Sequence, residues 1–199
     1  MNVQLAILAA GRSSRLGRPK QLIEWEEQTL LHRVTQTVLR IQYAETSVCL
    51  ITGAYAEPVA AAVADLPVTV LFNPDWSEGM AASVRLATTY AIEQRADALL
   101  FVLTDQPHLD TPLLQEILNL YNGDANCIVV SDYDSDWGVP MLFGSAYFPE
   151  LLTLTGDRGA KPLANKYADQ LKKVAFPLGS VDIDTEEDWK GFAKSAFNP

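Results

Sequence analysis

Short apolar runs alternate along this chain with stretches of helical periodicity. The runs cover residues 3–8, 48–51, 68–72, 98–103, 127–130, 141–143 and 174–176. Most of them are unbroken, as in strands that are buried on both faces of a parallel sheet. We therefore predict strands at these positions, most of them parallel to one another.

Between the runs, apolar residues recur at spacings of three and four, which is the helical repeat. This repeat covers residues 30–41, 80–91 and 114–121. Thr111 and Pro112 are the expected N-cap and first residue of the third helix. A last helix is expected to begin near Thr185, with Asp184 or Thr185 as its cap. The alternation predicts a single α/β domain of three layers over residues 1–199, with ligands bound beyond the carboxyl ends of the strands.

Composition limits the class of protein. Apolar residues make up 48% and charged residues 20% of the chain, which is typical of a globular protein. A net charge of −10 argues against nucleic acid or an anionic membrane surface as a partner. There is neither an apolar stretch of about 18 residues nor a basic leader. Cys49 and Cys127 lie in apolar runs and are expected to be buried thiols, so we predict a cytoplasmic protein.

The charges are unevenly distributed. No acidic residue precedes Glu24, yet one basic segment holds Arg12, Arg15, Arg18 and Lys20. An acidic segment, residues 182–188, contains Asp182, Asp184, Glu186, Glu187 and Asp188. A compact basic segment in an acidic protein is expected to bind an anion, and the fold decides whether the two segments meet.

The basic residues belong to a loop that follows the first apolar run. This first loop, residues 8–20, reads Leu-Ala-Ala-Gly-Arg-Ser-Ser-Arg-Leu-Gly-Arg-Pro-Lys. Its small residues let backbone N–H groups approach a phosphate, which Arg15 and Lys20 can neutralise. The spacing excludes a Walker A loop and a Gly-x-Gly-x-x-Gly dinucleotide fingerprint. A Gly/Ser turn with solvated arginines is the alternative.

The first loop resembles the opening motif Leu-Ala-Ala-Gly-x-Ser-x-Arg-x-Gly-x-x-Lys of the nucleotide-diphospho-sugar transferase superfamily. Further segments resemble the MobA-like NTP transferases, most closely the molybdenum cofactor cytidylyltransferases; they are residues 73–83, 104–107, 156–161 and 182–188. The resemblance covers nearly the whole chain. It implies a three-layer, Rossmann-like fold with a mostly parallel sheet, CTP as donor and a molybdopterin-type acceptor.

Two carboxylates are candidate metal ligands. Asp105 follows the most apolar run, where it can hold Mg²⁺ or form a turn before Pro107. Asp184 can hold a metal or cap the last helix, with Glu187 closing a capping box. Asp182 is a reserve for Asp184. The resemblance places the metal ligands at Asp105 and Asp184, and therefore implies Mg²⁺ as the cofactor.

Small residues that open the second helix are candidates for contact with the nucleobase. Gly79 permits a close backbone approach, and Ser83 can donate or accept a hydrogen bond. A helix start packed on the sheet explains the same residues without a ligand. In the family this segment lines the base pocket, and Asn73 helps to shape it. The expected nucleotide-binding set is Leu8, Ala9, Ala10, Gly11, Arg12, Ser13, Ser14, Lys20, Asn73, Gly79, Met80, Ser83 and Thr104.

Contacts with the acceptor are expected from a separate set of residues. This set is Gly138, Pro140, Asp157, Arg158 and Lys161. Val139 stands where the family often carries the histidine of Gly-His-Pro. The acceptor side thereby loses a polar contact, which leaves the identity of the acceptor open.

Together these features predict an Mg²⁺-dependent nucleotidyltransferase with Lys20, Arg15 and Asp105 as catalytic residues. The acceptor's phosphate attacks the α-phosphorus of an NTP and pyrophosphate leaves. That phosphate is already anionic, so no side-chain base is required. The alternatives are a sugar- or polyol-phosphate nucleotidyltransferase and a non-catalytic accessory protein that binds a nucleotide or the cofactor. A transient contact with a molybdoenzyme or its maturation factors is also expected.

Overall fold

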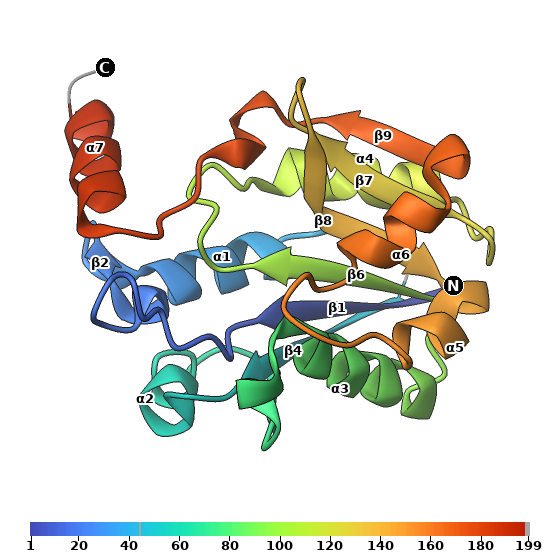
Figure 1. Cartoon of the computed structure of the whole chain (residues 1–199), viewed down its shortest axis with the longest axis horizontal. Coiled ribbons are helices and arrows are strands. Elements are labelled where there is room, and N and C mark those ends of the chain that lie inside the picture. The colour runs from blue at the N-terminus through green and yellow to red at the C-terminus, as the bar shows by residue number, and fades with distance from the viewer. Residues whose placement is uncertain (44, 198–199) are drawn as a thin grey trace.

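Seven strands form the central sheet of the computed structural model, which describes residues 1–43 and 45–197. The spatial order is β5-β4-β1-β6-β8-β7-β9 (Figure 1). The strands are β1 Asn2–Leu8, β4 Glu45–Thr52, β5 Thr69–Phe72, β6 Ala98–Leu103, β7 Ile128–Asp132, β8 Trp137–Gly144 and β9 Leu171–Ala175. Within this sheet the pairings are parallel, except the two that β8 makes with β6 and β7. The predicted mostly parallel sheet is confirmed.

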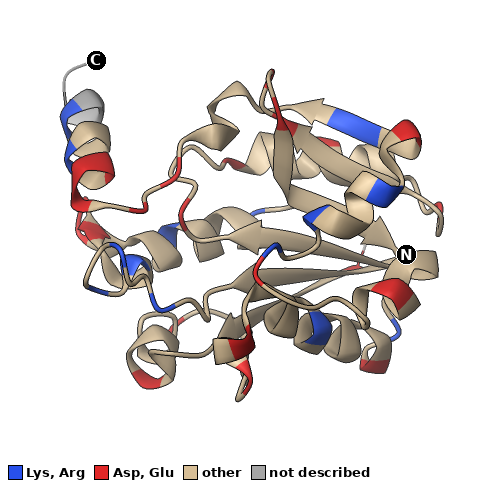
Figure 2. Cartoon of the chain, viewed as in Figure 1, with Lys and Arg blue, Asp and Glu red and all other residues tan. Residues whose placement is uncertain are grey.

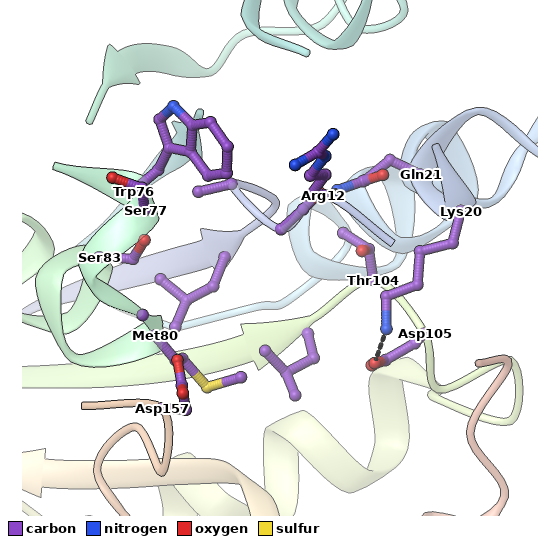
Figure 3. Close-up of a pocket in the computed structure, with 15 residues that line it drawn as sticks. Arg12, Lys20, Gln21, Trp76, Ser77, Met80, Ser83, Thr104, Asp105 and Asp157 are labelled. Atoms are coloured by element: carbon purple, nitrogen blue, oxygen red, sulfur yellow. Dashed lines mark hydrogen bonds and ion pairs between the residues drawn. The ribbon is translucent and has the colours of Figure 1, made fainter. Parts of the chain in front are cut away.

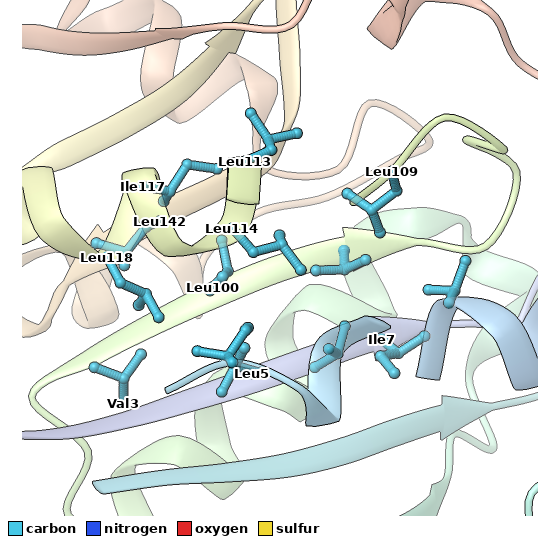
Figure 4. Packing of buried hydrophobic residues seen from close by; sticks show 14 of the residues in the cluster. Val3, Leu5, Ile7, Leu100, Leu109, Leu113, Leu114, Ile117, Leu118 and Leu142 are labelled. Atoms are coloured by element: carbon cyan, nitrogen blue, oxygen red, sulfur yellow. The ribbon is translucent and has the colours of Figure 1, made fainter. Parts of the chain in front are cut away.

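Helices cover both faces of the sheet. One layer holds α1 (Leu30–Leu39), α2 (Ala56–Ala61) and α4 (Thr111–Tyr121), and the other holds α3 (Met80–Glu93), α5 (Phe148–Leu151) and α6 (Lys161–Lys166). Successive residues of a strand point to opposite faces. Leu5 and Ile7 of β1 therefore join the apolar cluster under α1 and α4, as Figure 4 shows, while Ala6 and Leu8 join the cluster under α3. The three-layer α/β architecture is confirmed.

The strand order creates a crevice beside β1. From β1 the chain moves outward through β4 to β5, and it then returns to place β6 on the other side of β1. Connections on either side of this switch point diverge, so the loops after β1 and β6 leave space between them. Those loops are the first loop and the segment that begins with Thr104 and Asp105.

The helix starts differ in detail from the prediction. Asp110, and not Thr111, caps α4, because its carboxylate accepts from the Leu113 N–H at 2.9 Å. Helix α7 (Glu186–Phe197) is capped by Thr185. The Thr185 hydroxyl accepts from the Asp188 N–H, and the Asp188 carboxylate accepts from the Thr185 N–H at 2.8 Å. This reciprocal pair is a capping box, so the expected box between Asp184 and Glu187 is wrong.

A third apolar cluster attaches α7 to the rest of the protein. Its buried members are Leu16, Ile23, Leu30, Ile183 and Phe192. Trp25, in the hairpin of β2 (Glu24–Trp25) and β3 (Gln28–Thr29), contacts Phe192 edge-on with ring centroids 4.7 Å apart. Figure 1 accordingly shows α7 beside this hairpin. The cluster thus joins the acidic segment to the first loop.

The cysteines are buried, as expected, and both are free thiols. Burial raises the pKa of Cys49 to about 12 and raises the pKa of Cys127 as well. Within the described part of the chain, every helix is too short or too polar to cross a membrane.

Candidate active site

A cavity of about 340 Å³ lies at the carboxyl ends of β1 and β6 (Figure 3). The side chains that line it come from the first loop, the start of α3, the end of β6 and the loop before α6. They belong to Leu8, Ala10, Gly11, Arg12, Lys20, Gln21, Trp76, Ser77, Gly79, Met80, Ser83, Leu103, Thr104, Asp105 and Asp157. The structure therefore brings together most of the residues that the sequence singled out for nucleotide binding.

The first loop is held by its own hydrogen bonds. Ser13 adopts a positive φ of 53°, its carbonyl accepts from the N–H groups of Leu16 and Gly17, and its hydroxyl accepts from the Lys20 N–H at 3.2 Å. Ala9, Ser13 and Ser14 do not line the cavity. Gly11 does, and an added Cβ there would meet no atom of the described residues within 4 Å. The backbone at Gly11 is therefore open to a ligand.

Gln21, which the sequence analysis did not single out, hydrogen-bonds to the backbone of this loop. It is 1% exposed, and its Nε2 donates to the carbonyls of Ala9 and Gly11, each at 2.9 Å. These bonds fix the backbone that carries Gly11. A buried polar residue directly after the loop lysine was the available signal, but only the fold shows what it contacts.

One ammonium group lies between the two candidate metal ligands. Lys20 Nζ is 2.5 Å from Asp105 Oδ2 and 3.1 Å from Asp184 Oδ1. Asp105 is on the loop after β6, whereas Asp184 lies in the acidic segment before α7. The backbone joins these segments, because the Ile183 N–H donates to the Asp105 carbonyl at 3.0 Å. The fold therefore brings together the two segments that carry these carboxylates.

Burial and charge act in opposite directions on Lys20. Burial lowers its pKa, but the charges and hydrogen bonds of Asp105 and Asp184 outweigh burial, so the pKa of Lys20 lies above its ordinary value. Burial, with the charge of Asp105 next in importance, raises the pKa of Asp182 to about 6. A surplus of carboxylates thus surrounds one protonated lysine.

The basic and acidic segments meet in the fold. Arg15 Nη2 lies 2.6 Å from Asp184 Oδ2, and Arg18 Nε lies 2.7 Å from Glu186 Oε1. Figure 2 shows these opposite charges side by side at the base of α7. Arg15 does not line the cavity, and its side chain is 72% exposed. Its guanidinium would have to turn to reach a triphosphate.

The start of α3 forms the other end of the cavity. Gly79 has a φ of +107°, and a Cβ there would lie 2.2 Å from Asp157 Oδ1, so only glycine fits. Met80 and Ser83 line the cavity beside it. Asn73 is 2% exposed and stands behind the wall, where its Nδ2 donates to Ser83 Oγ at 3.0 Å.

Trp76 is a second residue that sequence reasoning missed. Its Cβ packs so close to Gly53 that a Cβ on Gly53 would lie 2.7 Å away. The indole lies at the end of the cavity near Ser77, across from Arg12 (Figure 3). Ser77 was missed as well. An aromatic residue before the predicted base-binding glycine was the available signal.

The expected acceptor residues do not form one cluster. Asp157 lines the main cavity next to Gly79, whereas Gly138, Pro140, Arg158 and Lys161 do not line it. Lys161 pairs with Asp136 at 2.6 Å and lies over the ring of Trp137. A Cβ on Gly138 would collide with the ring of Tyr133, so that glycine serves packing. Only Asp157 is therefore placed to contact a ligand in this cavity.

The chain around Val139 is tied to the residue after Asp105. Gln106 Nε2 donates to the carbonyls of Val139 and Gly179, at 3.0 and 2.8 Å, and to the Tyr133 hydroxyl at 2.9 Å. Tyr133 also donates to the Val139 carbonyl. Gln106 thereby connects the expected acceptor side to the loop that carries Asp105.

The carboxylate oxygens of Asp105 and Asp184 are suitable ligands for a divalent cation. Oδ1 of Asp105 is buried and finds no hydrogen-bond partner among the described residues. A buried carboxylate oxygen without a partner is unfavourable, and a hard cation would satisfy it. No group of three or more His, Cys, Asp or Glu side chains in the described residues is arranged around a common point. Asp105 and Asp184 would therefore supply only part of a coordination shell, as is usual for Mg²⁺.

Comparisons with known proteins agree with this geometry. The sequence pattern of the family described as MobA-like NTP transferase domain matches residues 5–171. Nicotine blue oxidoreductase of Paenarthrobacter nicotinovorans is 33% identical over 190 residues, which cover 91% of each chain. Molybdenum cofactor cytidylyltransferase of Escherichia coli K12 is 24% identical over 191 residues, which cover 94% of this chain and 93% of the relative.

Solved structures show the same architecture. Rv0371c of Mycobacterium tuberculosis H37Rv superposes with a TM-score of 0.83 at 30% identity, covering 96% of this chain and 97% of the other. A second structure of Rv0371c is its complex with manganese, with a TM-score of 0.80 at 27% identity, covering 98% and 100% of the two chains.

Proposed function

This chain belongs to the MobA-like NTP transferase family, and on that premise we propose that it transfers CMP from CTP to a phosphorylated acceptor of the molybdopterin type. The family match makes it a nucleotidyltransferase. The donor and the acceptor are the parts that we propose. The cytidylyltransferase relative, which spans nearly the whole chain, supports both.

The observation that carries the proposal is the polarity of the cavity from end to end. Lys20 and Asp105 lie at one end, and the small residues of α3 with Trp76 lie at the other. A nucleoside triphosphate has the same asymmetry, because its phosphates are anionic and its base is flat and largely apolar. We place the triphosphate along Gly11 and Lys20, and the base near Gly79 and Ser83.

In the proposed reaction an oxygen of the acceptor's phosphate attacks the α-phosphorus in line with the leaving group. A new P–O bond forms, the bond from the α-phosphorus to the bridging oxygen breaks, and pyrophosphate departs. Lys20 and Arg15 would stabilise the negative charge of the triphosphate and the leaving group. The cavity would hold the reacting atoms in register, so positioning contributes together with electrostatics.

We propose Mg²⁺ as the cofactor, held by Asp105 and Asp184. When bound, it would neutralise charge that develops on the phosphates. The unpartnered Asp105 oxygen supports this assignment. The manganese complex of Rv0371c supports a divalent cation in a related protein without deciding between the two metals. The buried free thiols, which suit a reducing compartment, support a cytoplasmic location.

The acceptor is the part that the relatives do not fix, because their names refer to different chemistry. Two features of this chain bear on it. Val139 presents an apolar side chain where a histidine is frequent in the family, and Asp157 brings a carboxylate to the cavity wall. Both make that side less attractive to an additional phosphate, so we expect an acceptor that carries a single phosphate.

The first experiment is a thermal-shift panel of CTP, GTP, ATP and UTP, each with and without Mg²⁺. A nucleotide present at 100 times its Kd adds about 2.7 kcal/mol of stability, which is about 5–10 °C for a chain of this size. We expect CTP with Mg²⁺ to give the largest shift. Pyrophosphate release is then measured over molybdopterin and sugar- and polyol-phosphate acceptors. Nucleotide binding without release of pyrophosphate from the NTP in the presence of any acceptor would instead favour the accessory-protein alternative.

A further inference from the structure

The position of the Lys20 ammonium suggests a role that precedes catalysis. It lies 2.5 Å from one carboxylate oxygen of Asp105 and 3.1 Å from one of Asp184. These are the two groups to which the proposed function assigns the divalent cation. Figure 3 shows the lysine side chain pointing along the cavity wall to Asp105. The ammonium therefore occupies the space between the proposed metal ligands.

The surrounding charges show why a cation is needed there. The side chain of Asp105 is only 12% exposed, and that of Asp184 is 31% exposed. The hydrogen bond from the Ile183 N–H to the Asp105 carbonyl joins these segments through the backbone and uses neither carboxylate. Two carboxylates held at low exposure without a cation would repel each other and lose hydration. Lys20 removes this cost, while Arg15 neutralises only the outer oxygen of Asp184.

The same ammonium cannot serve both positions at once. Mg²⁺ takes carboxylate oxygens at about 2.0–2.1 Å, and the ammonium already holds Asp105 Oδ2 and Asp184 Oδ1 at hydrogen-bond distance, so a metal cannot join the carboxylates through these two atoms. A cation on the remaining Asp105 Oδ1 would lie next to the ammonium. A divalent cation beside the ammonium would also be repelled by it. For Lys20 to contact a triphosphate, its ammonium must leave the carboxylates. The two events, departure of the lysine and arrival of the metal, are therefore coupled.

We propose that Lys20 is a built-in counter-ion that closes the Asp105–Asp184 site to divalent cations until a nucleoside triphosphate draws the ammonium away. This inference rests on the proposed function. Its consequence is that the free protein binds a divalent cation poorly, and that metal and nucleotide bind as a pair. A methionine at position 20 has nearly the same length and no charge, so it opens the site without a nucleotide.

The test is a titration of the intact protein with Mn²⁺ alone, followed by electron paramagnetic resonance of the free ion. We expect the Kd for Mn²⁺ to fall at least tenfold in Lys20→Met relative to wild type. Adding Asp105→Asn to Lys20→Met should abolish the gain. The matched control is Lys166→Met, which removes a lysine that is also ion-paired, to Glu150 at 2.5 Å, but lies outside the cavity. Lys166→Met should bind Mn²⁺ as wild type does.

An unchanged Kd in Lys20→Met would overturn the counter-ion role. If that variant does not fold, Lys20→Gln, which keeps a hydrogen-bond donor without the charge, decides by the same criterion. A parallel titration of wild type with Mn²⁺ and each of CTP, GTP, ATP and UTP in turn separates this inference from the proposed function. Tight joint binding with an unchanged Lys20→Met Kd overturns the counter-ion alone. Absence of joint binding with every NTP removes the proposed function, and the counter-ion inference with it.

Discussion

Gly11→Ala separates the ligand-binding role of the first loop from its structural role. Gly11 is exposed, its φ lies outside the left-handed region, and a Cβ would meet no atom of the described residues within 4 Å. Alanine therefore fits the free protein without strain. At such a site the substitution stabilises by about 0.4–1 kcal/mol, because it restricts the unfolded chain. We expect the free energy of unfolding to stay the same or rise by this amount.

Nucleotide binding should respond in the opposite direction. If phosphate oxygens approach the backbone at Gly11, the added methyl group occupies space that the ligand needs. Loss of one hydrogen bond between a backbone N–H and a charged oxygen costs about 1.5–3 kcal/mol. At about 1.4 kcal/mol for each factor of ten, the Kd for the nucleotide rises about tenfold to 100-fold. The variant would be at least as stable as wild type and a much weaker binder.

Isothermal titration with CTP and Mg²⁺ measures the Kd, and urea denaturation measures the stability. Gly191→Ala is the matched control, because a Cβ at Gly191 in α7 also meets open space. Alanine there should stabilise the exposed helix by about 0.5–1 kcal/mol and leave the Kd unchanged. A wild-type Kd in Gly11→Ala would refute the placement of phosphate on this loop. A large loss of stability would contradict the conclusion that a methyl group at position 11 fits the free protein.

Three further predictions follow from named groups. Lys20→Ala and Asp105→Ala should each lower turnover by about 10²-fold or more, measured by pyrophosphate release, since the first removes a cation that stabilises the phosphates and the second a proposed ligand of the metal that does so; wild-type rates in both would rule out the proposed mechanism. Cys49 and Cys127, with raised thiol pKa values, should not react with a disulfide reagent at pH 8 until the protein unfolds; fast native reaction would contradict their burial. Thr185→Ala removes the α7 cap and should lower stability by about 1 kcal/mol in denaturation; no change would mean that the cap contributes nothing.

The strands that the sequence predicts best are those whose burial is uniform. Residues 98–103 were predicted with the observed bounds, because each side chain of that run faces a covered side of the sheet. Only residues 141–143, in the second half of β8, were predicted. Its first half, Trp137–Pro140, contains a glycine and a proline, which are residues that usually interrupt strands. Helices α2 and α6 have six residues each, too few for the helical repeat to be recognised.

The residues of the site also divide into those that the sequence predicts and those that it does not. Lys20 and Asp105 were predicted because each lies in a loop after a recognisable strand and matches a motif of the family that the sequence resembles. Gln21 and Trp76 were missed because their roles depend on contacts with residues remote in sequence, such as Gly53 against Trp76. The cap of α7 shows a third case. Either Asp184 or Thr185 could begin the capping box. Because Thr185 begins it and pairs with Asp188, the carboxylate of Asp184 is left for other partners.

The backbone that carries the two carboxylates is fixed, whereas the side chain of Lys20 can move, and this difference determines how a cation could enter. Surface ion pairs such as Arg18 with Glu186 contribute at most about 1 kcal/mol, so they do not fix the acidic segment. Ile183 does, because it is 0% exposed in the third cluster and its N–H donates to the Asp105 carbonyl. The segments that carry Asp105 and Asp184 are thus joined through the backbone, whereas Lys20 reaches the two carboxylates on a flexible side chain. Exchange of the ammonium for another cation then requires rotation of one side chain and no movement of the sheet.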